Sequence, residues 1–578
     1  MSGCLSSPGK RNRQLPTMSE SSYANGNNSV VDESVTDTSE KPRIFGPYTR
    51  HLLEIFETYA KDGKLSLCNV VSAFHDLNLY PSHSQVHQMV HCAVEYGSPC
   101  VANNITFGEF CVLVEELQHH YIKNQPLPCP SSAVKLKCDG TESRRKRKES
   151  QSNSQVFLGG SCNPTTWRHD LAIPFLKKRV ITFYNPQVNT WRPELIELED
   201  KAKQAADLLC FVIDNQTRAV VSMIETSYLV GCYRQIIFVM KPYDRDEDIT
   251  VKDETVTDAE NSDLKRVRNV LIDIVERNSI PVFTDIKDAL QCIVYCVHQG
   301  IPVQDLEKHH GANPVKHGHF ETGHALLKLR ETFNSITCDN NEKMSRKDVQ
   351  LAYKCITGEV LPSNCIQSHS RVSSFTFEDL CCLVTECKKR RPSNTLSFLS
   401  RLISPFTSFI NKFRSRPPPP VFDDGECRDV YLGGSYGVST WRENMAVPLL
   451  RRHGLSYLNP IVNEWSYNLI PMQVAAREKC RLLLYVFTRD TRSFAAMVEA
   501  GYYIGRGCRV VLCIQYITRD AVIAGEKLSE SALEDYNRGR MYLSDMASKE
   551  GIQIFDDIND SINCAISLLK EIKEPKEI

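Results

Sequence analysis

Short runs of apolar, β-branched residues alternate with longer amphipathic runs between residues 156 and 298. The short runs are typical of buried strands, and the longer runs have the period of helices that cover a sheet. The predicted strands are VFLGG from Val156, ITFYNP from Ile181, DLLCFVID from Asp207, QIIFVMK from Gln235 and IPVFTD from Ile280. The predicted helices span residues 166–178, 194–206, 219–233, 263–278 and 286–298. This alternation predicts a parallel sheet wound on both faces, in flavodoxin-like order.

The same pattern occurs a second time. Residues 156–240 align with residues 430–514 without a gap at a constant offset of 274, and 28 of the 85 positions are identical. Unrelated segments do not reach this identity, so the chain contains a duplicated α/β unit, called here the first and the second copy. All four tryptophans fall at matched positions: Trp167 with Trp441, and Trp191 with Trp465. We therefore predict two superposable α/β domains.

A helical segment precedes each copy. The first contains HLLEIFETYAKDGKLSLCNVVSAFHDLNL from His51 and ITFGEFCVLVEELQ from Ile105. The second contains LLKLRETFNSITCDNNEKMSRKDVQLAYKCI from Leu326 and FTFEDLCCLVTECKK from Phe375. Both have the rhythm of paired EF-hands, in which a helix, a short polar loop, a hydrophobic β-position and a second helix follow one another. The duplicated unit is thus an EF-hand-like helical module followed by an α/β domain.

Calcium binding in such loops requires oxygen ligands at positions 1, 3 and 5 and a bidentate Glu at position 12. Three loops aligned on their hydrophobic β-positions offer, in this order, Thr58, Ala60, Asp62 and Asn69; Ser98, Cys100, Ala102 and Glu109; and Thr337, Asp339, Asn341 and Asp348. None of them holds the complete ligand set. We expect modules that pack or bind peptides without a metal, and we expect no cofactor.

Composition changes between these units and divides the chain. The N-terminus is rich in Ser, Asn, Thr and Asp, a linker carries the basic run 144–148, and a second linker carries four consecutive prolines at 417–420. Such segments bury too little apolar surface to order, and the prolines favour a polyproline II spacer. The expected division is a disordered 1–43, helical module 44–122, basic linker 123–154, first α/β domain 155–300, linker 301–319, helical module 320–392, Pro-rich linker 393–426 and second α/β domain 427–572.

Charge and hydropathy argue against a nucleic-acid-binding, membrane-spanning or secreted protein. Lys and Arg number 69 and Asp and Glu number 70, which gives a net charge of −1 and no overall field for collecting nucleic acid or membrane. No apolar stretch reaches 18 residues and no signal peptide is recognisable, so we expect no membrane span and no secretion. The 23 cysteines contain no CxxC pair with zinc spacing, and we interpret them as free thiols of a reducing compartment. We expect a cytoplasmic protein, with the basic run as a candidate nuclear-import signal.

Two features resemble a known enzyme family. The LGGS opening of each copy, and a glutamate in the helix after strand three (MIETSYLVG and MVEAGYYIG), are similar to nucleoside 2-deoxyribosyltransferases. The layout of two copies, each preceded by EF-hand-like helices, resembles the Raw-repeat proteins of animals from about residue 45 to residue 572. The first resemblance implies an α/β nucleoside site. The second implies a developmental regulator.

The transferase resemblance implies that Glu225, and Glu499 at the matched position, stand where the enzymes carry their nucleophile. A carboxylate there attacks the anomeric carbon as the base leaves and forms a glycosyl-enzyme ester. Ligands of doubly wound sheets bind outside the carboxyl ends of the strands. The candidate ligand-binding residues at that position are Gly159, Gly160, Ser161, Asn185, Asp207, Asp214, Arg218, Gly433, Gly434 and Ser435.

The catalytic set of the transferases is incomplete in both copies. The transferase pattern has an aspartate six residues before the nucleophile, where this chain has Ala219 and Ser493. The first copy keeps two aspartates around strand three, whereas the second has Arg481 and Thr488 there. We expect the first copy to retain a nucleotide-sized pocket with little or no turnover.

Each shared residue also has a structural interpretation. The glutamates are either part of an inherited sugar-binding site or solvated positions on a helix. The glycines either let a phosphate group come close to the backbone or form a tight strand-to-helix turn. Trp167 and Trp191 are better explained as core or interface anchors than as stacking platforms. Arg168 and Arg218, with Arg442 and Arg492 in the second copy, contact either an anion or carboxylates of the fold.

We therefore expect a non-catalytic signalling regulator or scaffold that binds protein partners and a nucleotide-like small ligand. The Raw-repeat resemblance implies that it limits stress-activated (JNK-type) kinase signalling in epithelial or neuronal development. The alternative is an N-glycoside hydrolase or transferase that acts on a nucleoside, nucleotide or NAD-like ligand through Glu225, with the second copy as its structural partner.

Overall fold

The computed structural model of this chain describes residues 43–97, 104–123, 154–188, 192, 195–243, 250–251, 254–316, 323–337, 343–366, 372–390, 427–437, 439–462 and 465–573. Several sequence predictions lie outside these residues. They are the disordered N-terminus, the basic run 144–148, the proline run 417–420, Trp191 and the loop positions Ser98, Cys100, Ala102, Asp339 and Asn341.

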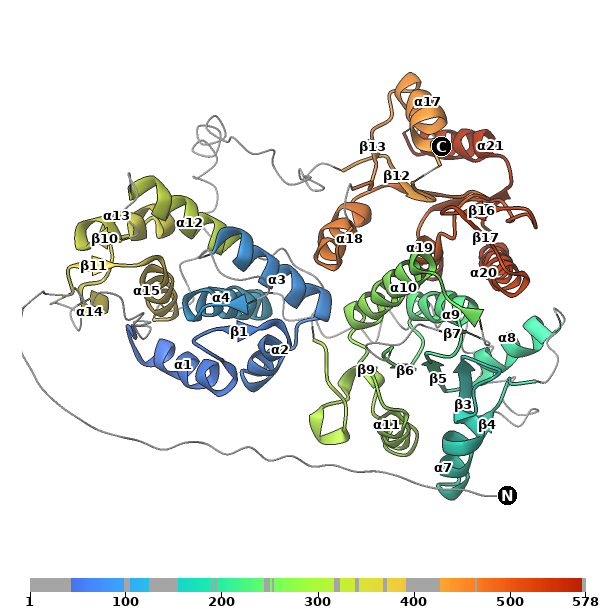
Figure 1. The fold of residues 1–578 in the computed structure, drawn as a ribbon, viewed down its shortest axis with the longest axis horizontal. Coiled ribbons are helices and arrows are strands. Elements are labelled where there is room, and N and C mark those ends of the chain that lie inside the picture. Colours follow the sequence, from blue (N-terminus) through green and yellow to red (C-terminus); the bar gives the residue numbers. More distant parts are fainter. Residues whose placement is uncertain are drawn as a thin grey trace, which may run out of the picture. The chain divides into compact units, whose positions relative to one another are not determined.

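The first copy is a five-stranded parallel sheet with the strand order β4-β3-β5-β6-β9, drawn in green and teal in Figure 1. The strands are β3 (Val156–Gly160), β4 (Phe183–Tyr184), β5 (Leu208–Ile213), β6 (Ile236–Met240) and β9 (Val282–Phe283). The helices are α7 (Ile173–Lys178), preceded by the π-turn Arg168–Ala172, and α8 (Leu195–Ala205), α9 (Val220–Gly231), α10 (Asp258–Arg277) and α11 (Ile286–Gln299). The predicted doubly wound, flavodoxin-like sheet is confirmed.

The second copy repeats this topology in the order β13-β12-β14-β15-β18. Its strands are β12 (Val430–Gly434), β13 (Tyr457–Leu458), β14 (Leu482–Phe487), β15 (Val510–Ile514) and β18 (Ile554–Phe555). Its helices are α17 (Val447–Arg452), after the π-turn Arg442–Ala446, and α18 (Ile470–Glu478), α19 (Phe494–Gly505), α20 (Glu530–Lys549) and α21 (Ile558–Lys573). Each copy also carries a hairpin before its 20-residue helix, β7 (Thr250–Val251) with β8 (Glu254–Thr255), and β16 (Val522–Ile523) with β17 (Glu526–Lys527).

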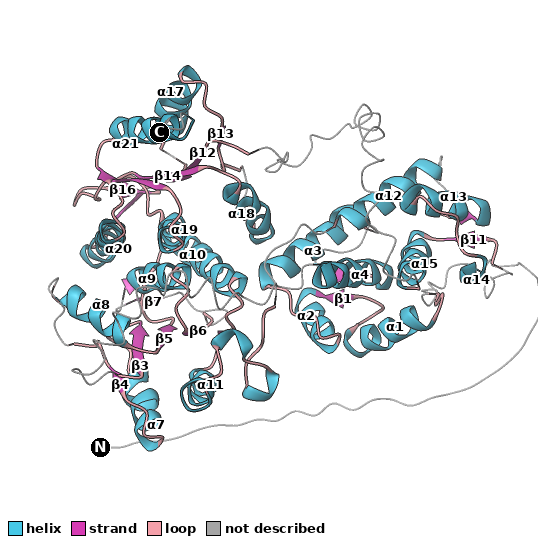
Figure 2. Cartoon of the chain, turned by 180° about the vertical axis from the view of Figure 1, so that it is seen from behind, coloured by secondary structure: helices cyan, strands magenta, loops and turns pink. Residues whose placement is uncertain are grey.

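The two copies pack against each other through helices. Figure 2 shows α9, α10, α19 and α20 between the two sheets, and residues from both copies share one apolar core. Helix α9 meets α19 at glycines, because a Cβ at Gly231 would lie 2.3 Å from the Tyr502 carbonyl oxygen and a Cβ at Gly505 would lie 2.2 Å from that of Tyr228. The interface thus relates matched residues reciprocally, as in a symmetric dimer.

The helical modules contain α1 (Pro47–Tyr59), α2 (Leu67–Asp76), α3 (His83–Tyr96) and α4 (Phe107–Lys123), and then α12 (His324–Ile336), α13 (Arg346–Thr357), α14 (Ser363–Ile366) and α15 (Phe377–Lys389). The predicted β-positions pair as short antiparallel strands: β1 (Leu65–Ser66) with β2 (Asn104–Ile105), and β10 (Met344–Ser345) with β11 (Ser374–Phe375). The two modules bury one common core, and α4 packs on α15.

Two of the side chains at the twelfth loop positions cap the N-termini of helices. The Glu109 carboxylate accepts from the Thr106 amide at 2.8 Å, and the Asp348 carboxylate accepts from the Ser345 amide at 2.9 Å, both at helix N-termini. Among the residues described, no group of three His, Cys, Asp or Glu side chains could hold a metal ion. Within the same residues, no helix is long and apolar enough to cross a membrane.

The first helical module contacts both copies. The His83 amide donates to Glu276 of α10 at 2.9 Å, and the Ser84 hydroxyl donates to Asp273 at 2.6 Å. The His87 ring lies 4.9 Å from the ring of Tyr467 in the second copy. One helix, α3, is therefore seated on both α/β copies.

Candidate functional site

A pocket of about 280 Å³ lies beside the carboxyl ends of the strands of the first copy. Glu225 lines it together with Gly159, Gly160 and Ser161, so the structure brings the predicted nucleophile position and the predicted glycine loop together. The glycines are required there. Gly160 has a φ of +101°, and a Cβ on it would lie 2.1 Å from the Val212 carbonyl oxygen. The loop is thus built by close strand packing, independently of a ligand.

Glu225 forms a buried ion pair that the sequence did not predict. Its carboxylate contacts the Lys203 ammonium from α8, and the two side chains are only 11% and 7% exposed. Burial lowers the pKa of Lys203, but the charge of Glu225 raises it by more, so the pKa lies above its usual value. Lys203 is therefore charged at neutral pH, and the Glu225 carboxylate is already occupied by this cation.

A second carboxylate, Glu199, lines the same pocket on α8. Its oxygen lies 4.0 Å from the Lys203 ammonium. Burial and the negative charge of Glu225 raise the pKa of Glu199 to about 7. Glu199 is thus a proton-holding group near neutral pH, next to a charged carboxylate.

Replacing Glu199 by Gln will make the protein more stable above pH 7, by about 1 to 3 kcal/mol, because the raised pKa opposes folding of the charged form. An acid with a folded pKa of about 7 and an ordinary value of 4.5 loses stability as the pH rises from 4.5 to 7. Urea unfolding at pH 5 and pH 8 should show that loss in the wild type and less of it in the variant. Glu197→Gln on the exposed face of α8 is the control. Equal pH dependence in wild type and Glu199→Gln would contradict the prediction.

Other predicted site residues serve the loops around the pocket. Arg168 is fully buried, and its Nε and Nη1 donate to the carbonyl oxygens of Leu158 and Ser161 at 3.0 and 2.6 Å. It is a clamp on the glycine loop, and its partners are backbone carbonyls, whereas the sequence left open an anion or a carboxylate. The Trp167 indole also donates to the Ser161 carbonyl, at 3.3 Å, which confirms its interpretation as a core anchor.

The predicted aspartates and the asparagine also lie outside the pocket lining. Asp207 is exposed and precedes β5 at the amino end of the strand, the edge opposite the glycine loop, so its assignment to the site is corrected. Asp214 is buried and accepts from the Gln216 amide at 3.0 Å, within its own turn. Asn185 likewise accepts from the Gln187 amide at 3.1 Å.

Arg218 lines the pocket and joins the two copies. Its guanidinium pairs with Glu260 at 2.6 Å and with Asp535 of α20 at 3.5 Å. The matched arginine, Arg492, pairs with Asp263 of α10 at 3.2 Å. Both arginines are thus committed to carboxylates of the fold, with one partner in the opposite copy.

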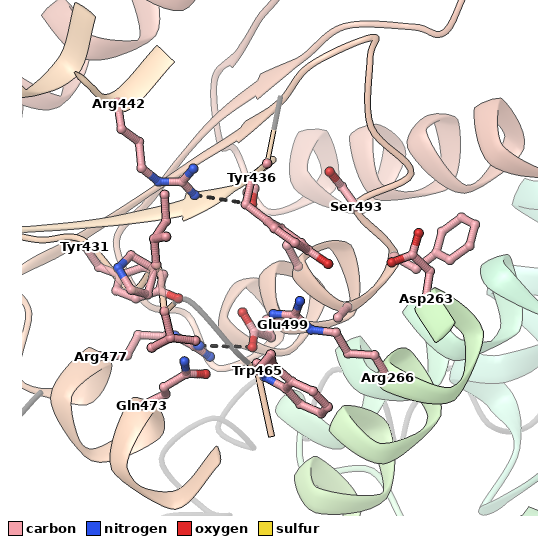
Figure 3. Close-up of a pocket in the computed structure, with 18 residues that line it drawn as sticks. Asp263, Arg266, Tyr431, Tyr436, Arg442, Trp465, Gln473, Arg477, Ser493 and Glu499 are labelled. Carbon is pink, nitrogen blue, oxygen red and sulfur yellow. Dashed lines mark hydrogen bonds and ion pairs between the residues drawn. The ribbon is translucent and has the colours of Figure 1, made fainter. Parts of the chain in front are cut away.

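The second copy holds a larger pocket, of about 370 Å³, at the matched place. Figure 3 shows Glu499 pointing toward Arg477, whose Nη2 lies 3.0 Å from the carboxylate. Burial works against the charge of Arg477, but Glu499 raises its pKa well above the ordinary value. Arg477 of α18 occupies the position that Lys203 has in α8. In both copies the matched glutamate is therefore neutralised by a cation from the equivalent helix. Gly434 lines this pocket, whereas Gly433 packs against Tyr485, and buried Ser435 hydrogen-bonds with Thr491 and Ser493.

Each pocket is completed by the opposite copy. Asp535, Arg538 and Tyr542 of α20 line the pocket of the first copy. Asp263 and Arg266, at the matched positions of α10, line the pocket of the second. Sequence reasoning missed these residues because the gapless alignment stops at residues 240 and 514, before the helices begin. The recurrence of Asp and Arg three residues apart in both 20-residue helices was the available signal.

The places of the missing aspartates are the N-caps of α9 and α19. Ala219 and Ser493 both have left-handed backbones, with φ of 50° and 56°. Both line their pockets, so a carboxylate at either position would face the cavity. Neither pocket has that acid.

Comparison with known proteins identifies the α/β copies. Residues 153–243 and residues 427–517 each match the family model described as "Nucleoside 2-deoxyribosyltransferase like". The two matched segments begin and end at equivalent positions of the copies and include both glutamates. No significant match was found among curated proteins or among solved structures. The chain therefore carries two nucleoside 2-deoxyribosyltransferase-like domains in tandem.

Proposed function

We propose that this protein is a non-catalytic regulator in which the two transferase-like copies bind a small ligand and partner proteins without converting the ligand. The observation that carries the proposal is the occupation of both candidate nucleophiles by buried cations, Lys203 on Glu225 and Arg477 on Glu499.

A cation on the carboxylate opposes glycosyl transfer for two reasons. It lowers the electron density available for attack on the anomeric carbon. It also places positive charge beside a transition state that resembles an oxocarbenium ion, which is itself positive. The aspartate absent at positions 219 and 493 removes a further group from both sites. Losses of this kind commonly cost factors of about 10² to 10⁴ in rate.

The remaining architecture supports a scaffold. The helix–loop–helix pairs, joined through their β-positions, support the EF-hand-like interpretation of both modules, and the twelfth-position carboxylates cap helices there. With the resemblance to Raw-repeat proteins, this supports a cytoplasmic regulator that limits stress-activated (JNK-type) kinase signalling through protein partners in epithelial or neuronal development. The basic run 144–148 supports an additional nuclear role.

The proposal predicts that the full-length protein releases no base from nucleosides, nucleotides or NAD. Chromatographic detection of free base is the measurement, with Glu225→Gln and Glu499→Gln as matched variants. In Glu225→Gln, Lys203 still has the Glu199 carboxylate 4.0 Å away as a counter-charge. Circular dichroism should verify that both variants fold. Base release by the wild type that is lost in Glu225→Gln and kept in Glu499→Gln would establish an active glycosidase in the first copy instead.

One observation favours that second candidate, an N-glycoside hydrolase or transferase in the first copy. Glu199 holds a proton near neutral pH and lines the pocket with Glu225, as a general acid for a leaving base would. The second copy has Gln473 at this position. If the enzyme exists, its activity should therefore disappear in Glu199→Gln.

A further inference from the structure

The two pockets differ in charge. The pocket of the second copy is lined by three arginines (Arg266, Arg442 and Arg477) and two carboxylates (Asp263 and Glu499). The pocket of the first copy is lined by two arginines (Arg218 and Arg538) and three carboxylates (Glu199, Glu225 and Asp535), with Lys203 behind them. The exchange of Glu199 for Gln473 at a matched position accounts for part of this difference. Duplication has thus produced a basic pocket and a more acidic one.

Arg266 is the cation of the basic pocket that forms no direct ion pair among the described residues, although the charge of Asp263 acts on it from one turn away. Arg442 donates to the carbonyl oxygens of Leu432 and Gly434, at 2.9 and 3.3 Å, and Arg477 is paired with Glu499. Within the described part of the chain, Arg266 forms no ion pair, and its buried Nε has no hydrogen-bond partner. Asp263, one turn earlier on α10, pairs with Arg492 instead.

The matched arginine shows why Arg266 is unpaired. Arg538 of α20 forms an ion pair with Glu534, four residues before it on the same helix. The residue four positions before Arg266 is Ser262, which is exposed and carries no charge. Helix α10 therefore presents a guanidinium without a direct ion pair to the second copy's pocket, whereas the matched arginine of α20 is paired within its own helix.

Aromatic side chains surround this guanidinium. The Arg266 Cζ lies 4.6 Å from the ring centre of Tyr436 and 4.7 Å from that of Trp465. Figure 3 shows Arg266 reaching from α10 of the first copy to these residues of the second. Aromatic faces accept a planar ring by stacking, and an arginine fork binds phosphate or carboxylate through two N–H groups. The cavity of about 370 Å³ is within the range of small-molecule sites.

We propose that the pocket of the second copy binds a planar aromatic anion, with Arg266 holding the anionic group and Trp465 and Tyr436 stacking on the ring. The inference accepts the ligand-binding role proposed above and assigns it to the second copy, with Arg266 supplied by the first. Binding therefore links the two copies through the ligand.

Isothermal titration calorimetry on the full-length protein tests this site with AMP as the probe. Adenosine has the ring without the anion, and inorganic phosphate has the anion without the ring. A charge-assisted contact and a stacked ring predict that each binds at least about tenfold more weakly than AMP. Equal affinity for AMP and adenosine, or no binding of AMP by the wild type, would overturn the proposal.

Matched variants locate the site. Arg266→Gln should weaken AMP binding at least about tenfold, because a charged donor is lost. Ser262→Glu should also weaken it, because the new carboxylate stands four residues before Arg266 and competes with the ligand. Ser262 is exposed, so the second variant tests the site even if Arg266→Gln folds poorly. Lys265→Gln removes the charge of an exposed neighbour of Arg266 on α10 that lines neither pocket, and it should leave the affinity unchanged. Loss of binding in Arg538→Gln, the equivalent change at the other pocket, and not in Arg266→Gln would assign the ligand to the first copy.

The outcome is separable from that of the base-release assay. AMP binding without release of adenine supports both proposals. AMP binding at the Arg266 site together with release of adenine supports the proposed binding site but refutes the proposal that the protein is non-catalytic. Absence of both binding and release refutes only the site.

Discussion

Replacing Lys203 by Met will lower the free energy of unfolding by about 3 to 5 kcal/mol, the usual cost of removing one partner of a buried ion pair. The Glu225 carboxylate would remain without its cation, with a side chain only 11% exposed and close to the second carboxylate Glu199. Urea unfolding of the full-length protein at neutral pH measures the change.

Three further variants separate this effect from general disruption of α8. Lys203→Arg should retain most of the stability, because the second copy uses Arg477 at the matched position. Lys203→Met combined with Glu225→Met should recover most of the loss, because no unpaired charge remains. Lys201→Met alters a 68% exposed lysine on the same helix and should change stability by less than about 0.5 kcal/mol. A stable Lys203→Met protein would show that the pair is not closed in solution.

Replacing Gly505 by Leu will separate the two α/β copies and lower stability by about 3 kcal/mol or more, at the upper end of overpacking costs. A Cβ there would lie 2.2 Å from the Tyr228 carbonyl oxygen, and a backbone atom cannot turn aside as a side chain can. The helices α9 and α19 must move apart, and both belong to the shared core. Thermal unfolding and limited proteolysis should show earlier unfolding and cleavage between the copies.

The reciprocal site offers the control for this prediction. Gly231→Leu on α9 should have a similar effect, because its Cβ would meet the Tyr502 carbonyl oxygen at 2.3 Å. Gly551→Ala, at a left-handed glycine with φ of +73° and open space around it, should cost only the conformational strain of about 1 to 2 kcal/mol. If Gly505→Leu is no worse than Gly551→Ala, the copies do not pack through these glycines.

Matched comparison of the copies separates structural roles from chemical ones. Arg168 and Arg442 repeat the same contacts to backbone carbonyls, so their identity in both copies follows from the shared glycine loop. Glu199 and Gln473, by contrast, stand at one position with different chemistry. The second kind of difference is where the two pockets acquired separate properties.

The amino-acid sequence by itself determined the local order of the chain. Apolar β-branched runs at the right length predicted the five strands of each copy, and the gapless repeat predicted that the copies share one topology. The sequence also predicted that Glu225 lies beside the glycine loop. The helix that follows strand three begins at the same edge of the sheet as the loop after strand one. These relations depend on neighbours along the chain and on strand order, both of which can be read from periodicity.

Only the tertiary structure decided which charges meet. Lys203 lies 22 residues before Glu225, on a different helix, and nothing in the spacing of those residues indicates an ion pair. Asp207 is a different case, because it begins the predicted strand three and its place at the amino end of that strand could be read from the sequence. Arg266 reaches the second copy because α9 and α19 meet at glycines and bring α10 alongside. Periodicity fixes which face of an element is buried, whereas the partner of a buried charge depends on how those faces dock.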